Sequence, residues 1–172
     1  MRIWTALAAA SAALSPATAL AQDGFAVGMG REITITLDGA AKATDPVEIT
    51  PDDFEIQSGL QFNRGDHAEA MGPVGKPMYG ATPPVTPNLV RVRFTPVAGA
   101  KPGSLLVIAN GYDRALVWRA FILVRGKTKP TDVCIVLPGR HGVEHWPYPI
   151  EAIGLADMRL EPWKPEDGVR CE

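Results

Sequence analysis

The chain has 172 residues, 46% of them hydrophobic and 21% charged, so it is long enough to bury the core of one globular domain. Its 17 glycines and 16 prolines favour a fold with many turns over a bundle of helices. The formal net charge is −2 and no run of Lys or Arg occurs, which excludes the basic surface of a nucleic-acid-binding protein or of a protein held on a membrane by positive charge.

The first 21 residues predict a cleaved signal peptide. Arg2 is the positive n-region, residues 3–14 are apolar, and the Ala-Leu-Ala sequence at 19–21 fits a signal-peptidase site, so the mature chain begins at Gln22. Cleavage removes one basic residue, and the formal charge becomes −3 (17 − 1 basic against 19 acidic residues). No later apolar run approaches the ~20 residues of a membrane-spanning helix. The sequence therefore predicts a bacterial protein that is periplasmic or secreted and not inserted in the membrane.

Residues 22–172 are predicted to form one domain of about seven strands. Residues 31–38 and 89–97 alternate between apolar and polar side chains, which is the pattern of half-buried strands. Residues 53–62 alternate in the same way, and Asp52-Asp53 before them is typical of a turn. One face of this predicted strand holds Phe54, Ile56, Ser58, Leu60 and Phe62. The other predicted strands are 104–110, 115–124, 133–137 and 154–160.

The strand at 115–124 is predicted to turn Leu116, Trp118, Ala120, Ile122 and Val124 toward the core and to be covered on its other face as well. Residues 63–88, with four glycines and five prolines, predict an irregular loop, residues 125–132 a polar turn, and residues 138–149 another loop. Short strands separated by turn signals predict an all-β fold, an antiparallel immunoglobulin-like β-sandwich, with a small β-barrel as the alternative.

Two cysteines remain in the mature chain, Cys134 and Cys171. In an oxidising compartment a single pair of this kind predicts one disulfide. The bridge would close a loop of about 38 residues, which the loop-closure model values at roughly 4 kcal/mol of stability. No Cys-x-x-Cys spacing occurs that would favour a redox or metal role.

The loop at 138–149 contains the densest group of side chains able to bind a partner. We predict a binding surface formed by Arg140, His141, Glu144, His145, Trp146 and Tyr148. Exposed aromatic side chains suit contact with an envelope protein or a glycan. The alternative is structural: Trp146 and Tyr148 would close one end of the sandwich, and the histidines would lie at the surface.

A metal carrier is the second functional hypothesis. Imidazole suits zinc, and imidazole together with thioether suits Cu⁺, so the candidate ligands are His67, Met71, Met78, His141 and His145. No Gly-x-Ser-x-Gly motif and no glycine-rich phosphate loop occurs, so neither an enzyme nor any other cofactor is predicted. The sequence favours a non-enzymatic binding or accessory protein of the cell envelope, and it leaves the oligomeric state open.

Three short runs in the C-terminal part resemble small exported bacterial proteins of no known activity. They are Asn-Gly-Tyr-Asp-Arg-Ala-Leu at 110–116, Thr-Asp-Val-Cys at 131–134 and Glu-His-Trp-Pro-Tyr-Pro-Ile-Glu at 144–151. The resemblance covers about the last two-fifths of the chain. It implies export and assigns a role to none of the residues.

Overall fold

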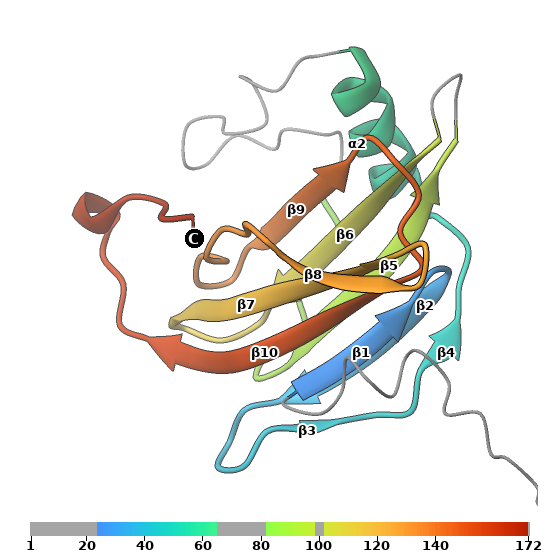
Figure 1. Ribbon diagram of the computed structural model, residues 1–172. Helices are drawn as coiled ribbons and strands as arrows, with labels where there is room; N and C mark the ends of the chain where they lie inside the picture. The colour runs from blue at the N-terminus through green and yellow to red at the C-terminus, as the bar shows by residue number, and fades with distance from the viewer. Residues whose placement is uncertain (1–23, 65–81, 99–101, 172) are drawn as a thin grey trace, which may run out of the picture.

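The computed structural model describes residues 24–64, 82–98 and 102–171, which form two antiparallel β-sheets packed face to face and one α-helix outside them (Figure 1). The first sheet has the order β1 (Gly24–Gly28), β10 (Ala152–Glu161), β7 (Ala115–Val124) and β8 (Lys127–Thr131). The second sheet has the order β3 (Lys42–Ala43), β2 (Arg31–Thr36), β5 (Val90–Val97), β6 (Gly103–Asn110) and β9 (His141–Trp146), and β4 (Val47–Glu48) also pairs with β2. The predicted β-sandwich is confirmed. No strand pair between the described residues joins the two sheets, so the alternative prediction of a small β-barrel is wrong.

The core lies between the two sheets. The alternation predicted for β7 is correct, because Leu116, Trp118, Ala120 and Ile122 are all buried in it. They pack against inward side chains of the second sheet, which include Ile33, Val92, Phe94 and Ile108. Val117 and Leu123 on the other face of β7 are buried as well, in agreement with the prediction that this strand is covered on both sides.

Helix α2 (Asp53–Arg64) occupies the segment where the sequence predicted a strand, and that prediction is wrong. Phe54 and Ser58 are buried, whereas Ile56 and Leu60 are 46% and 40% exposed, so burial follows the helical period. Asp52 starts the helix with a capping box: its Oδ1 accepts the Glu55 N–H, and Glu55 Oε2 accepts the Asp52 N–H, both at 2.9 Å. The prediction placed Ile56 and Leu60 on the same face as Phe54, Ser58 and Phe62, and the helix turns those two residues outward. Phe54, Ser58 and Phe62 are spaced by four and fit a strand or a helix, which is why the pattern misled.

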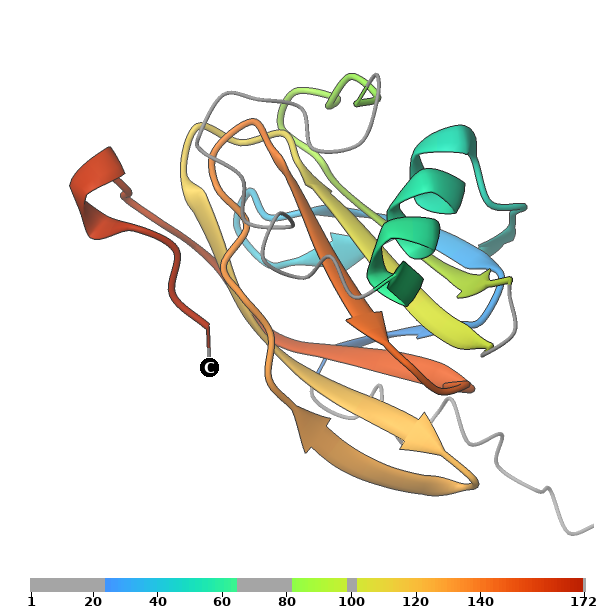
Figure 2. The same cartoon turned by 90° about the horizontal axis from the view of Figure 1, so that it is seen from above.

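The helix lies on the side of the second sheet that faces away from the first sheet, so the molecule has three layers (Figure 2). Phe54 packs there against Val97, Leu105 and Val107, the outward side chains of β5 and β6. A Cβ atom on Gly59 would lie 2.8 Å from Val97 Cγ1, so glycine at this position lets the helix approach the sheet closely.

Among the described residues, five strands occur where the sequence predicted no strand. Three of them, β1, β3 and β4, lie before α2 and outside the predicted strand at 31–38. β8 lies in the predicted polar turn and is an exposed edge strand, so no alternation of apolar residues marks it. Arg125 and Gly126, with φ of 51° and 69°, form the tight turn that joins it to β7. β9 lies in the predicted loop at 138–149 and pairs with β6 from Ala109↔His141 to Ser104↔Trp146. The predicted strand at 133–137 is instead an irregular segment with isolated bridges at Cys134 and Val136.

Cys134 and Cys171 form the predicted disulfide. The predicted signal peptide, residues 1–21, and residues 65–81 of the predicted loop at 63–88 lie outside the described residues. Within that loop, Asn63 and Arg64 belong to α2, and residues 82–88 contain no helix or strand. In the described part of the chain, no helix has both the length and the apolar character to span a membrane.

Candidate functional site

Strand β9 sends the side chains of the predicted binding surface in opposite directions. His141 and His145 lie on the outward face of the second sheet, beneath α2, where their rings contact those of Phe54 and Phe62. Glu144 and Trp146 point to the opposite face of the strand, where they form hydrogen bonds with Cys134 and Thr131. The predicted residues therefore do not form one continuous surface.

Trp146 is a core residue and not an exposed contact, which corrects the sequence-based prediction. Its side chain is 6% exposed, its ring lies edge-on to Phe94 with the centroids 6.4 Å apart, and its Nε1–H donates to Thr131 Oγ1. Tyr148 is half-buried against the core, with Lys129 Nζ 5.3 Å from its ring centroid. The structural alternative describes these two aromatic residues correctly.

Glu144 is half-buried. Its Oε1 accepts the Cys134 N–H at 2.8 Å. Burial raises the pKa of its carboxyl from 4.5 to about 7, and the hydrogen bond from Cys134 opposes part of that rise. This carboxyl therefore helps to hold the segment around Cys134 in place.

The two histidines are each held by a different phenylalanine. The His141 ring centroid is 5.6 Å from that of Phe54, and the His145 ring stacks on Phe62 at 4.8 Å. Four residues of strand span ~13 Å, and the eight residues from Phe54 to Phe62 span ~12 Å of helix. These two lengths match, so one helix that runs along β9 can make both aromatic contacts, one near each end.

The candidate metal ligands are not brought together in the described part of the chain. A shared ion with bonds of ~2 Å would need both imidazoles to leave their phenylalanines, since their backbones are ~13 Å apart. The described residues contain no group of three or more His, Cys, Asp or Glu side chains able to hold a metal ion. His67, Met71 and Met78 lie outside the described residues, so the metal site stays a prediction.

His141 is kept neutral by its surroundings. The pKa of its imidazole is lowered from 6.5 to about 4, mainly by burial and also by the positive charge of Arg91, while Asp52 opposes both effects. Arg91 and His141 belong to the same row of the sheet and are separated only by Ala109. His141 Nε2 is buried and has no hydrogen-bond partner among the described residues.

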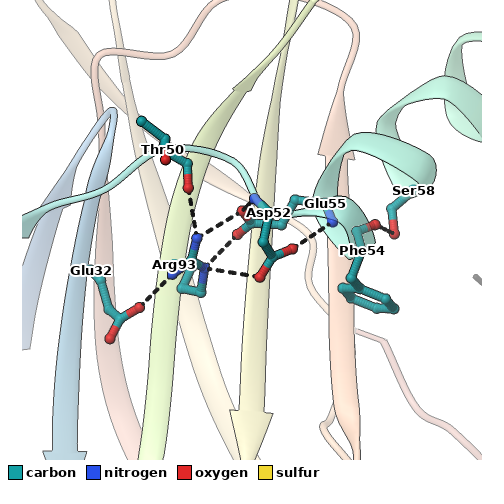
Figure 3. A network of polar contacts seen from close by, with 7 residues as sticks. All are labelled: Glu32, Thr50, Asp52, Phe54, Glu55, Ser58 and Arg93. Carbon is teal, nitrogen blue, oxygen red and sulfur yellow. Dashed lines mark hydrogen bonds and ion pairs between the residues drawn. The ribbon is translucent and has the colours of Figure 1, made fainter. Parts of the chain in front are cut away.

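The N-terminal end of α2 is held by an ion-pair network centred on Arg93 of β5 (Figure 3). Arg93 Nε and Nη2 donate to the two carboxylate oxygens of Glu55 at 2.8 and 3.0 Å, and Nη1 donates to Glu32 Oε2 at 2.8 Å. Nη2 also donates to the carbonyl of Thr50 at 2.9 Å. The hydrogen bonds that Arg93 donates to Glu55 raise the Arg93 pKa further above its ordinary value, against the effect of burial. The guanidinium therefore stays charged and fixes α2 to the sheet.

Neither the Arg93 network nor the surface of α2 that it supports was predicted from the sequence. Ile56 and Leu60 lie one turn apart on the outward side of α2, with Asp53, Gln57 and Asn63 exposed around them. We call these five residues the α2 face. The Asp-x-x-Glu sequence at 52–55, which is a capping box, was the signal that could have revealed the helix and its exposed side.

The α2 face is the most exposed apolar feature on a rigid element among the described residues, because Val47 and Val169 lie on a two-residue strand and on the C-terminal tail. Helix α2 is fixed at its start by Arg93 and along its length by Phe54 and Phe62.

Comparison with protein-family models, with curated proteins and with solved structures finds no match for this chain.

Proposed function

We propose that this protein is a non-enzymatic binding or accessory protein of the bacterial cell envelope, periplasmic or secreted, and that it contacts a partner protein through the α2 face. The observation that carries the proposal is the pair Ile56 and Leu60, which are 46% and 40% exposed on a helix fixed to the sheet. A rigid apolar surface loses little conformational entropy on binding, which favours association. The Cys134–Cys171 disulfide suits the oxidising compartment that export implies.

The polar residues around the apolar pair fit a protein partner. Asp53, Gln57 and Asn63 are exposed beside Ile56 and Leu60, so the surface has a small apolar centre and a polar rim. The site thus moves from the predicted loop at 138–149 to the helix above β9. Of the residues predicted for the binding surface, Arg140 is the one that is exposed, whereas the others are half-buried or buried.

Photocrosslinking tests this proposal. A photoreactive amino acid at position 56 or 60, used in intact cells, should give the same discrete adduct with one envelope protein. Val169 is the matched control, because it is also apolar and 40% exposed but lies on the C-terminal tail. Ile56→Glu should abolish the adduct formed from position 60. No adduct at 56 and 60, or the same adduct from position 169, would contradict the proposal.

A further inference from the structure

The two cysteines of the disulfide have very different surroundings, and the Cys134 side is firmly anchored. The Cys134 N–H donates to Glu144 Oε1 at 2.8 Å, and its carbonyl accepts the Trp118 Nε1–H at 3.0 Å. Two residues later, Val136 is buried and exchanges two backbone hydrogen bonds with Leu116 of β7. The backbone on both sides of Cys134 therefore belongs to the packed body of the sandwich.

The Cys171 side is loosely held. Residues 162–171, which we call the C-terminal tail, loop away from the sandwich and return to it at their end (Figures 1 and 2). Every residue from 164 to 171 is exposed. Two hydrogen bonds between described residues join the tail to the body beside the bridge. The Ile135 N–H donates to the Arg170 carbonyl at 2.9 Å, and Arg170 Nη2 donates to Glu161 Oε2 at 3.3 Å.

We propose that the Cys134–Cys171 bridge is a thiol-exchange site, at which a small-molecule thiol attacks the Cys171 sulfur and releases the C-terminal tail while the sandwich stays folded. The proposal does not depend on the function of the α2 face. Exchange requires the attacking sulfur to approach in line with the S–S bond, from the side opposite the leaving sulfur. For attack at Cys171 that approach runs from the exposed tail, whereas for attack at Cys134 it runs from the packed body.

The reaction balances with two molecules of thiol. The first thiolate forms a bond to the Cys171 sulfur, the Cys134–Cys171 bond breaks, and the electron pair stays on the Cys134 sulfur, which takes a proton from water. The second thiolate attacks the mixed disulfide and leaves a Cys171 thiolate, which is protonated in turn. The protein disulfide is reduced by two electrons, and the two thiol molecules are oxidised to one disulfide.

Trapping the mixed disulfide tests which sulfur is attacked. The native protein is treated with reduced glutathione at mildly alkaline pH, quenched with iodoacetamide and analysed by peptide mass spectrometry. We expect glutathione on Cys171 and alkylation on Cys134, with roughly a tenfold preference that disappears in concentrated urea. Equal labelling of the native protein, or glutathione mainly on Cys134, would overturn the proposal. So would a reduction rate that follows global unfolding as urea is added.

A matched pair of arginine variants tests the release of the tail. Arg159 and Arg170 both pair with Glu161, at 2.8 and 3.3 Å, but only Arg170 belongs to the tail. Arg170→Ala should speed native-state reduction about twofold to fivefold, in line with the loss of one surface ion pair, and Arg159→Ala should leave the rate unchanged. In the reduced protein, hydrogen exchange should stay slow in β6 and β7 and should lose protection at the Ile135 amide. Equal effects of the two variants, or loss of protection in β6 and β7, would refute release from a folded sandwich.

Discussion

Replacing Arg93 should destabilise the protein strongly, because it leaves a buried carboxylate without its charge partner. The Arg93 side chain is 12% exposed and that of Glu55 is 1% exposed. Glu32 and Asp52, the other acidic partners, are 19% and 38% exposed and can be hydrated when Arg93 is lost. The cost therefore comes mainly from Glu55. Removing one member of a buried ion pair typically lowers the free energy of unfolding by about 3–5 kcal/mol, and we expect Arg93→Met to fall in that range.

The chain contains a matched control for this variant. Arg31 pairs with Glu48 at the same 2.8 Å, but the two side chains are 40% and 82% exposed. Exposed pairs contribute about 0–1 kcal/mol, so Arg31→Met should change the free energy of unfolding by no more than that. Urea denaturation followed by circular dichroism measures both variants. Hydrogen exchange of the α2 amides should rise in Arg93→Met, because the helix loses its attachment at the N-terminal end.

A double variant separates the loss of the ion pair from the loss of packing. Arg93→Met combined with Glu55→Met removes both charges, and it should recover most of the stability that Arg93→Met loses, since the buried carboxylate is gone. If Arg93→Met costs no more than Arg31→Met, the network does not fix α2. If the double variant is as unstable as the single one, the unpaired charge of Glu55 is not the cause.

The remaining predictions concern pH, packing and metal. The folded-state pKa of His141 is lowered from 6.5 to about 4. The stability that the neutral imidazole contributes is therefore present above pH 6.5 and lost as the pH falls toward 4. The urea midpoint should fall less on acidification in His141→Phe than in the native protein. The folded-state pKa of Glu144 is raised from 4.5 to about 7. The stability that the protonated carboxyl contributes is therefore present below pH 4.5 and lost as the pH rises through 7. In Glu144→Gln the urea midpoint should fall less over this pH range than in the native protein. Gly59→Ala should destabilise the protein through contact with Val97, and in a Val97→Ala background it should instead stabilise by up to about 1 kcal/mol, the helix preference of alanine; the same sign in both backgrounds would contradict the packing. If Zn²⁺ or Cu⁺ binds in calorimetry, His141→Ala and His145→Ala should act independently, and an equal loss of binding from either one would show a shared ion.

The elements that the sequence predicted correctly are those whose burial alternates along one strand. The runs at 31–38, 89–97 and 115–124 have one consistently apolar face, and a period of two with β-branched residues has no helical counterpart. The disulfide was predictable as well, because a chain that is predicted to be exported and has two cysteines allows a single pairing. These features depend on local pattern and composition.

The helix and the candidate site depended on information that local pattern does not contain. The side chains at 54, 56, 58, 60 and 62 alternate as in a strand, but Phe54, Ser58 and Phe62 also fit one face of a helix. Packing against β5 and β6 decides for the helix and leaves Ile56 and Leu60 on its exposed side. β9 was hidden because it is an edge strand whose outward residues, His141, Val143 and His145, alternate in polarity under the helix. Its pairing is with β6, more than thirty residues earlier in the chain.

The sequence by itself determined the fold class, the strands with one buried face and the bridge between Cys134 and Cys171. Only the tertiary structure decided that Arg93 and Glu55 meet, that Trp146 is buried and that Ile56 and Leu60 are exposed. The physical reason is that a periodic pattern reports how one segment distributes its apolar side chains. Which other segment covers them is set by long-range packing between segments far apart in the chain.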